Sequence, residues 1–270
     1  MESLFQGFIE CKLRKMNEKL AYIEENKGVA TIWLNRPEKR NAFNNDMILE
    51  LLKCIDYVNQ LNEDTVVLLR GKGDAFCSGA DLNWMLDASN LSEKENFSEC
   101  LNLSKMLLEL YNCNKVTIAV VHGAAFGGGV GLASACDIVI ADETTKFSLS
   151  ELRIGVVAAS ISPYIFKKVG ESRMKELIYT ANVFKGDEAV SYGLVNKSVP
   201  LISLEKSIQS YIDKIKMGAP KARIMSKKLI HKVSDGEITE KTIEETAGIL
   251  AKVRVSGEAK ERIGIFLSKE

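Results

Sequence analysis

The sequence predicts an α/β fold in which short, buried, parallel strands alternate with helices. Apolar runs such as TVVLL (residues 65–69) and VTIAVV (residues 116–121) are rich in β-branched residues and too short for helices. Segments with helical spacing separate these runs, which favours parallel pairing through crossover connections. The 270 residues, of which 46% are hydrophobic, are enough to bury a large core without disulfide or metal support.

The first half of the chain begins with a predicted β-hairpin over residues 19–35. LAYIEE and VATIWLN both alternate between apolar and polar residues, and Asn26-Lys27-Gly28 supplies the turn between them. A helix is expected next, because Met47, Leu51 and Ile55 recur at helical spacing. The elements expected after the hairpin are a helix over 46–61, strands over 65–69, 116–121 and 137–141, and a helix over 93–111.

After Pro163 the pattern changes to consecutive helices. The helical segments expected there are 160–169, 172–180, 204–217, 220–233, 240–253 and 257–268. The last of these are too apolar to stand alone, so we expect them to pack on the core or on a neighbouring subunit. The predicted organisation is an N-terminal extension over residues 1–18, a core with the active site over 19–198, and a C-terminal helical region over 199–270.

Charge, hydropathy and the spacing of Cys and His argue against several classes of function. Lys and Arg number 36 and Asp and Glu also number 36, whereas a nucleic-acid-binding protein usually carries a basic excess. No apolar run reaches the roughly 18 residues of a membrane helix, and the N-terminus is a poor signal peptide, so we expect a cytoplasmic protein. Two distant histidines and six scattered cysteines form no zinc motif, and no metal is expected. The cysteines are Cys11, Cys54, Cys77, Cys100, Cys113 and Cys136.

The most informative segment is HGAAFGGGVGLASACD, residues 122–137. It contains five glycines directly after a predicted buried strand, where a helix is expected to start. The N–H groups of a helix N-terminus can stabilise an anion or a developing negative oxygen. The run matches neither the dinucleotide-binding pattern nor a Walker loop. Close packing of the helix on the strand, without any ligand, is the alternative interpretation.

A second loop, FCSGADLNWM over residues 76–85, follows the strand at 65–69 in the same way. Two neighbouring parallel strands would bring both loops to the same edge of the sheet, where α/β proteins bind ligands. Backbone N–H groups that converge there would form an oxyanion hole. The two loops therefore favour a ligand site over simple packing.

Four motifs together resemble the crotonase, or enoyl-CoA hydratase, superfamily. In chain order they are NRPEKRNAF (35–43), FCSGADLNWM (76–85), HGAAFGGGVGLASACD (122–137) and FSLSELRIG (147–155). The resemblance runs from about Leu20 to the C-terminus. It implies a crotonase-type spiral of ββα repeats, followed by a C-terminal helical trimerisation region, and trimers that pair into hexamers. FCSGADLNWM, GGGVGL and SELRIGVVAASISPY are most similar to bacterial methylglutaconyl-CoA hydratases.

The resemblance also implies an acyl-CoA site. The N–H groups of Ala80 and Gly128 would hold the thioester oxygen, and Glu151 would transfer the proton. Two-glutamate hydratases carry another glutamate three residues after the glycine donor, where this chain has Gly131. Our hypothesis is that Glu151 acts alone, with water or the substrate's own carboxylate in the space beside Gly131.

The same resemblance implies contacts with CoA, which enters as part of the substrate, with no separate cofactor. Phe266 and Lys269 resemble positions that reach the adenine end, including from a neighbouring subunit. The remaining positions lie in or beside the first three motifs: Lys39, Arg40, Ala42, Ser78, Ala80, Asp81, Leu82 and Gly128.

Several of these residues have structural interpretations as well. Ser148-x-x-Glu151 fits a helix capping box. Cys77 is expected to be a small packing residue, and His122 to shape its turn by bonding to backbone. Asp81 is expected to hold the Ala80 turn through local backbone hydrogen bonds, with Trp84 and Met85 in the pocket wall or core. Arg153 would either pair with a second substrate carboxylate or form a structural ion pair.

The expected function is the reversible hydration of 3-methylglutaconyl-CoA to 3-hydroxy-3-methylglutaryl-CoA, by a carbon–oxygen lyase. One alternative is a polyketide β-branching dehydratase that acts on the same acyl group on a carrier protein. A general enoyl-CoA hydratase and a non-catalytic CoA-ester-binding subunit are further alternatives.

Overall fold

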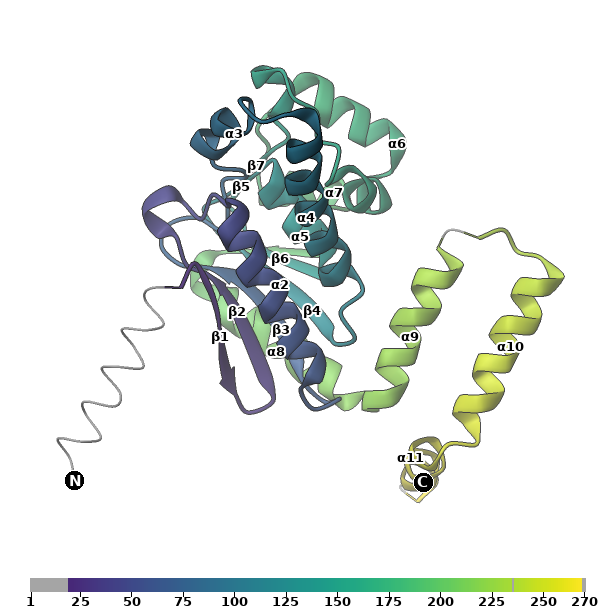
Figure 1. Ribbon diagram of the computed structural model, residues 1–270. Helices are drawn as coiled ribbons and strands as arrows, with labels where there is room; N and C mark the ends of the chain where they lie inside the picture. The colour runs from purple at the N-terminus through teal and green to yellow at the C-terminus, as the bar shows by residue number, and fades with distance from the viewer. Residues whose placement is uncertain (1–18, 235, 269–270) are drawn as a thin grey trace, which may run out of the picture.

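The computed structural model describes residues 19–234 and 236–268; the predicted extension over residues 1–18 and the predicted contact Lys269 lie outside this range. Its main sheet has six strands in the order β1-β2-β3-β4-β6-β8, and a smaller sheet pairs β5 with β7 (Figure 1). The strands are β1 (Ala21–Asn26), β2 (Val29–Leu34), β3 (Val66–Gly71), β4 (Val116–Val121), β5 (Ala124–Phe126), β6 (Ile138–Asp142), β7 (Lys146–Ser148) and β8 (Lys197–Val199).

The pairing confirms the predicted strand arrangement. β1 and β2 form the antiparallel hairpin, and every later neighbour in the main sheet is parallel. The hairpin turn consists of Lys27 and Gly28, with φ of 46° and 74°. Positive φ at both central residues matches the right-handed twist of the strands, and glycine adopts it without steric cost.

Helices connect the parallel strands and cover the sheet. The predicted bounds of α4, α8 and α9 are confirmed. The two helices predicted on either side of residue 170 are also present: they are the two segments of α6, which are separated by non-helical backbone at Gly170, with φ of 71°. The helices are α2 (Asn45–Gln60), α3 (Leu82–Ala88), α4 (Glu93–Tyr111), α5 (Gly128–Ala135), α6 (Ser162–Thr180), α7 (Gly186–Ser191), α8 (Leu204–Met217), α9 (Pro220–Val233), α10 (Glu240–Arg254) and α11 (Gly257–Leu267).

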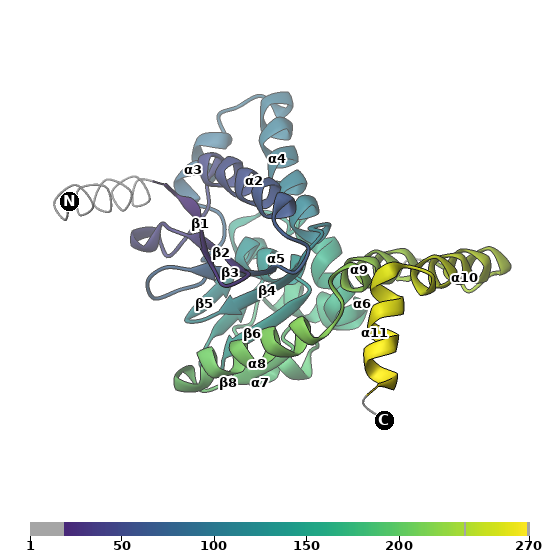
Figure 2. The ribbon, with the colours of Figure 1, turned by 90° about the horizontal axis from the view of Figure 1, so that it is seen from below.

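Two hydrophobic clusters fill the interior. The larger one joins the sheet to α2, α4 and α5. The smaller one joins it to α8, whose Leu204, Ile208 and Ile212 pack with Val66 of β3 and Ile118 of β4 (Figure 2). Although α8 follows residue 198, where the sequence suggested a boundary, its apolar face therefore belongs to the packed core.

The C-terminal arm, defined here as α9–α11, extends away from the sheet (Figures 1 and 2). None of its three helices contains a buried residue. Ion pairs attach α9 to the core: Arg223 binds Asp64 at 2.5 Å, and Lys227 binds Asp137 at 2.9 Å. Large apolar side chains of the arm are exposed, namely Ile230, Val233, Ile238, Ile243, Leu250, Val255, Ile263, Ile265, Phe266 and Leu267.

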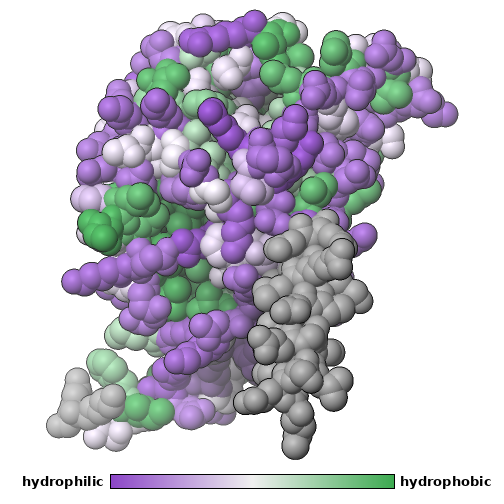
Figure 3. Space-filling view, turned by 90° about the vertical axis from the view of Figure 1, so that its left-hand side faces the viewer, coloured by the Kyte–Doolittle hydropathy of each residue, from purple (hydrophilic) through white to green (hydrophobic). Residues whose placement is uncertain are grey.

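The surface shown in Figure 3 is mostly hydrophilic, with separate hydrophobic patches, one of them at the C-terminal end of the arm. Across residues 19–234 and 236–268, none of the helices is both long and apolar enough to cross a membrane. In the same residues, no three His, Cys, Asp or Glu side chains gather in a way that could hold a metal ion.

Candidate active site

The two loops singled out in the sequence lie side by side at one edge of the sheet. β3 and β4 are parallel neighbours, with Val66 opposite Val116 and Arg70 opposite Val120. Beyond the strands the loops continue to pair: Cys77 N–H donates to the Ala124 carbonyl at 3.1 Å, and Phe126 N–H donates to the Cys77 carbonyl at 3.0 Å. The predicted convergence of residues 76–85 with residues 122–137 is therefore confirmed.

Two backbone donors at this junction have no acceptor. Phe43 pairs with the Ala80 loop through the Gly79 carbonyl and the Asp81 N–H, both at 2.9 Å, and this pairing bypasses the Ala80 N–H. Within the part of the chain that the structure describes, no hydrogen bond uses the N–H of Ala80 or of Gly128. Gly128 is the first residue of α5, so its N–H also lies at the positive end of the helix dipole.

Gly79 shows how closely the two loops approach. Its φ is +95°, and a Cβ added to it would lie 2.9 Å from the Phe126 carbonyl oxygen and 3.5 Å from the Gly128 nitrogen. Only glycine fits such a conformation at such a distance. The Ala80 and Gly128 loops are thus held in direct contact, with both free N–H groups at the contact.

Glu151 approaches the same place from the turn after β7. It is the first residue of the 3-10 helix η2 (Glu151–Ile154), and its Oε1 lies 2.8 Å from where a Cβ on Gly127 would be. Its Oε2 is buried without a hydrogen-bond partner among the described residues. Burial raises the pKa of Glu151 above its ordinary value. A carboxyl group with a raised pKa is suited to taking up and releasing a proton.

The capping-box interpretation of Glu151 is wrong. Ser148 is the last residue of β7, and its hydroxyl donates to the Ala181 carbonyl at 3.1 Å. The residue before η2 is Ser150, and its side chain makes no capping bond. Neither Ser148 nor Ser150 therefore accounts for the position of the Glu151 side chain.

An apolar side chain lies beside Gly131, where our hypothesis expected water or a substrate carboxylate. A Cβ on Gly131 would lie 2.1 Å from Cγ2 of Ile161, so this space is already occupied by a buried apolar side chain. The sequence pattern showed that a side chain is missing at position 131. Which residue fills its place depends on how α6 packs on α5, which the pattern does not reveal.

Comparison with known proteins agrees with this geometry. A family model described as enoyl-CoA hydratase/isomerase matches residues 24–270. The chain belongs to the enoyl-CoA hydratase/isomerase family. A short-chain-enoyl-CoA hydratase of Clostridium acetobutylicum is 34% identical over 212 residues, which cover 78% of this chain and 80% of that protein.

Solved structures of the enoyl-CoA hydratase/isomerase family share the fold. The crystal structure of an enoyl-CoA hydratase from Shewanella pealeana matches with a TM-score of 0.89 and 32% identity, covering 95% of this chain and 97% of that one. Pseudomonas aeruginosa AtuE matches with the same TM-score of 0.89 and 28% identity, covering 93% of this chain and 98% of that one. The predicted crotonase-type α/β fold with a helical C-terminal region is thus confirmed.

The loop that contains Ala80 is held by an ion pair between Arg36 and Asp81, which the sequence did not predict. Arg36 Nη1 lies 2.6 Å from Asp81 Oδ2, with both side chains largely buried, and also donates to the Ala42 carbonyl at 2.9 Å. Buried Asn41 accepts from Arg36 N–H and donates to the carbonyls of Lys72 and Ala75, each at 2.8 Å. This network ties the first motif to the second. The expected local role of Asp81 is confirmed, since Asp81 also caps α3 by accepting from Asn83 N–H at 2.9 Å.

Because of the Arg36–Asp81 pair, we expect the free energy of unfolding to decrease as the pH falls into the acid range. Burial alone would raise the pKa of Asp81, but hydrogen bonds from Arg36 and Asn83 outweigh it and lower the pKa. The stabilisation is therefore complete above the unfolded-state pKa of about 3.9 and is lost as the pH falls through the lower folded-state value. We expect Asp81→Asn to cost about 2–3 kcal/mol at pH 7, measured by urea unfolding, and progressively less below about pH 4.

Glu38 provides the matched control for this prediction. It lies 3.9 Å from Arg36 Nε, but its side chain is 67% exposed. Glu38→Gln should therefore change the free energy of unfolding by no more than about 0.5 kcal/mol. Equal effects of the two substitutions, or an Asp81→Asn cost that does not fall with pH, would contradict the role of the Arg36–Asp81 pair.

The predicted CoA-contact residues of the first two motifs lie together beside the candidate active site, on a surface that we call the rim. Ser78 N–H donates to the Arg40 carbonyl at 3.0 Å, and its hydroxyl donates to the Lys39 carbonyl at 3.3 Å. Lys39 and Arg40 are exposed, whereas Ala42 is buried. Leu82, 65% exposed, begins α3 directly after Asp81. Ala80 and Gly128 adjoin this rim, so the structure brings these eight predicted positions together.

Phe266 is not brought to this rim within one chain. It lies on α11 at the end of the C-terminal arm and is 70% exposed (Figures 1 and 2). Lys269, predicted with it, lies outside the described residues. Any contact of Phe266 with CoA would have to involve the site of another copy, so that contact stays a prediction.

Other side chains near the site have structural partners. His122 Nε2 donates to the Gly73 carbonyl at 2.8 Å, which confirms its expected bond to backbone. Trp84 donates to Glu99 at 2.8 Å and packs edge-on against Phe43, at a centroid distance of 6.5 Å. Arg153 Nη2 donates to the Ala181 carbonyl at 2.8 Å, and no ion pair joins it to Glu151 in the described chain.

Cys77 is buried in the Ala80 loop, and its thiol donates to the Asn41 carbonyl at 3.1 Å. Burial raises the pKa of Cys77 to about 12, so almost no thiolate forms near neutral pH. Cys100 is exposed on α4. We expect a maleimide at pH 7.5 to modify Cys100 and leave Cys77 unmodified, as measured by peptide mass spectrometry. Rapid labelling of Cys77 in the folded protein would contradict its assignment as a packing residue.

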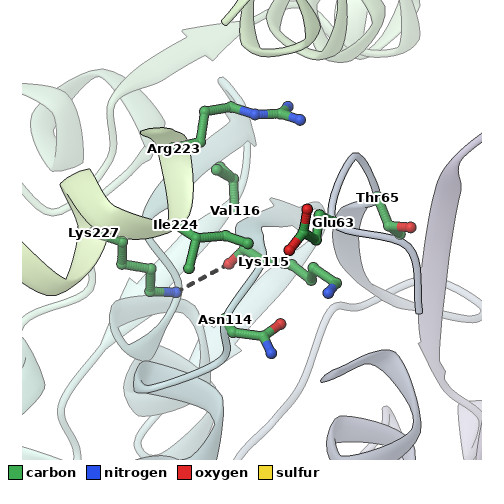
Figure 4. Close-up of a pocket in the computed structure, with 8 residues that line it drawn as sticks. All are labelled: Glu63, Thr65, Asn114, Lys115, Val116, Arg223, Ile224 and Lys227. Carbon is green, nitrogen blue, oxygen red and sulfur yellow. Dashed lines mark hydrogen bonds between the residues drawn. The ribbon is translucent and has the colours of Figure 1, made fainter. Parts of the chain in front are cut away.

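A small cavity elsewhere does not compete with this site. It lies at the opposite ends of the same strands, near Thr65 before β3 and Val116 at the start of β4 (Figure 4). Lys227 of α9 points toward it and donates to the Lys115 carbonyl at 3.2 Å. Its volume of about 10 Å³ is close to the minimum for one water molecule, so it cannot hold an acyl group.

Proposed function

We propose that the protein is an acyl-CoA hydratase that uses Glu151 as its only proton carrier and that its substrate is 3-methylglutaconyl-CoA. The observation that carries this proposal is the juxtaposition of Glu151, whose Oε2 is buried without a partner, with the N–H groups of Ala80 and Gly128, which have no acceptor among the described residues. Such a set can stabilise a thioester oxygen while moving a proton at the adjacent carbons.

The proposed reaction needs only one carboxylate. The thioester oxygen accepts hydrogen bonds from the N–H groups of Ala80 and Gly128. Glu151 takes a proton from water as the water oxygen bonds to C3 of the enoyl group, and the electrons of the double bond move onto the thioester oxygen. The same carboxyl group then delivers its proton to C2 and is regenerated as a carboxylate. One water molecule is added, and each step is reversible.

The branched substrate is supported by the sequence of the loops. FCSGADLNWM, GGGVGL and SELRIGVVAASISPY resemble methylglutaconyl-CoA hydratases more than two-glutamate enzymes. A general enoyl-CoA hydratase is equally compatible with the family match and is favoured by the 34% identical short-chain relative. The carrier-protein dehydratase and the non-catalytic CoA-ester-binding subunit remain alternatives without a specific structural observation in their favour.

The C-terminal arm supports assembly of the enzyme from several copies. Its exposed apolar side chains would be buried only against another protein surface, and burial of apolar area drives such association. We propose a trimer, or a hexamer of paired trimers, in which the arm contacts neighbouring subunits. Sedimentation measured with and without residues 219–270 would show whether the arm carries the assembly.

The function is tested by comparing kcat/KM for three substrates: crotonyl-CoA, 3-methylglutaconyl-CoA and the carrier-protein-linked methylglutaconyl thioester. We expect 3-methylglutaconyl-CoA to be preferred. Preference for crotonyl-CoA would replace the proposed substrate with a linear one, and preference for the carrier-linked acid would favour the dehydratase. Binding without turnover of any of the three would favour a non-catalytic subunit.

A further inference from the structure

Ile161 occupies the space that a side chain at position 131 would need. A Cβ added to Gly131 would lie 2.1 Å from Cγ2 of Ile161, 2.6 Å from its Cβ and 3.6 Å from its Cα. The first two distances are far below van der Waals contact, whereas the third is an ordinary contact. Both residues are buried, Ile161 with 4% exposure, so a side chain at position 131 could not turn into solvent.

This space faces the candidate site. Gly131 lies three residues after Gly128, on the same face of α5, and the Cα–Cβ bonds of a helix tilt toward its N-terminus. A side chain at position 131 would therefore point toward the end of α5 that presents the Gly128 N–H. Glu151 approaches the same end, because its Oε1 lies 2.8 Å from the Cβ position of Gly127.

We infer that Ile161 is a positioning residue that limits this site to a single proton-carrying side chain. By filling the space beside Gly131 with apolar atoms, it leaves no room there for the side chain that would carry a second carboxyl group. The proton of the reaction then has one carrier, Glu151. The chemistry of this inference rests on the proposed function, whereas its geometry rests on packing alone.

Paired substitutions test the packing. Gly131→Ala should lower Tm by roughly 5–10 °C, because it overfills a packed interior. Ile161→Ala leaves a Cβ 2.6 Å away and should relieve only part of this loss. Ile161→Gly leaves the nearest atom 3.6 Å away and should relieve it fully. Glycine is acceptable there because Ile161 is the N-cap residue of α6. A double-mutant cycle removes the separate cost of emptying position 161.

A second experiment tests the proton carrier. Gly131→Glu combined with Ile161→Gly should place a second carboxyl group at the site and add an ionisation to the pH profile of kcat/KM. It should also reduce the rate loss caused by Glu151→Gln by at least about tenfold. Gly131→Gln combined with Ile161→Gly is the matched uncharged control, and it should leave that loss unchanged.

The outcomes are distinguishable. An unchanged Tm for Gly131→Ala with Ile161 intact, or a coupling energy near zero in the double-mutant cycle, would contradict the claim that Ile161 fills the space beside Gly131. A folded Gly131→Glu/Ile161→Gly variant with the parental pH profile and the full Glu151→Gln loss would overturn the role of Ile161. If the wild-type protein hydrates no thioester, the proposed function fails. The double-mutant cycle of Tm values would still show whether Ile161 fills the space beside Gly131.

Discussion

Glu151→Gln should lower the hydration rate by about 10²–10⁴-fold while leaving binding of the CoA ester intact. Glutamine matches glutamate in shape but cannot take a proton from water or return it to carbon. Glu151 Oε2 has no hydrogen-bond partner among the described residues, so replacing this oxygen breaks no hydrogen bond there. Steady-state kinetics measure the expected loss of rate, and calorimetric titration with a CoA ester measures the expected retention of binding. A rate near that of the wild type would remove Glu151 from the mechanism.

The raised pKa of Glu151 adds two expectations with definite signs. Hydration needs the carboxylate, so kcat/KM should fall on the acid side at a pH above the ordinary glutamate value of about 4.3. A carboxyl group whose pKa rises on folding destabilises the protein as the pH increases through that range. Glu151→Gln should therefore raise Tm at pH 7, and this gain should vanish below about pH 4, where the group is protonated in both states.

The second large effect is expected from Ala80→Pro, which removes one of the two free backbone donors. We expect kcat/KM to fall by about 10²–10³-fold, the usual cost of one oxyanion-hole donor. The loop should still fold, because its pairing with Phe43 uses the Gly79 carbonyl and the Asp81 N–H rather than the Ala80 N–H. The backbone of Ala80 also has no positive φ that would exclude proline.

Ala80→Gly is the control for this loss. It keeps the N–H while removing the Cβ, so its rate should fall much less than that of Ala80→Pro. Circular dichroism and Tm measured on both variants separate a lost donor from a lost fold. If Ala80→Pro folds with near-native Tm and retains its rate, the Ala80 N–H does not stabilise the reacting oxygen.

Much of the fold followed from local pattern. The strand at Val116–Val121 and the helix at Glu93–Tyr111 have the bounds that periodicity predicts, because burial on both faces or on one stripe leaves a clear signature. The short helix α3 was missed, since it buries no residue and so leaves no apolar period. The sequence also left open whether the C-terminal helices pack on the core or on a neighbouring subunit, because an apolar stripe does not identify its partner; α8 packs on the core.

Four features could be predicted from the residues alone: the α/β class, the two glycine-bearing loops, the family resemblance and Glu151 as the candidate proton carrier. These features depend on residue type and short spacing, which a linear pattern records. Three contacts became visible only in three dimensions: Arg36 pairs with Asp81, Ser148 bonds to Ala181 rather than capping Glu151, and Ile161 occupies the space beside Gly131. Each of these joins segments brought together by packing, and side-chain packing depends on distances in space that residue spacing does not encode.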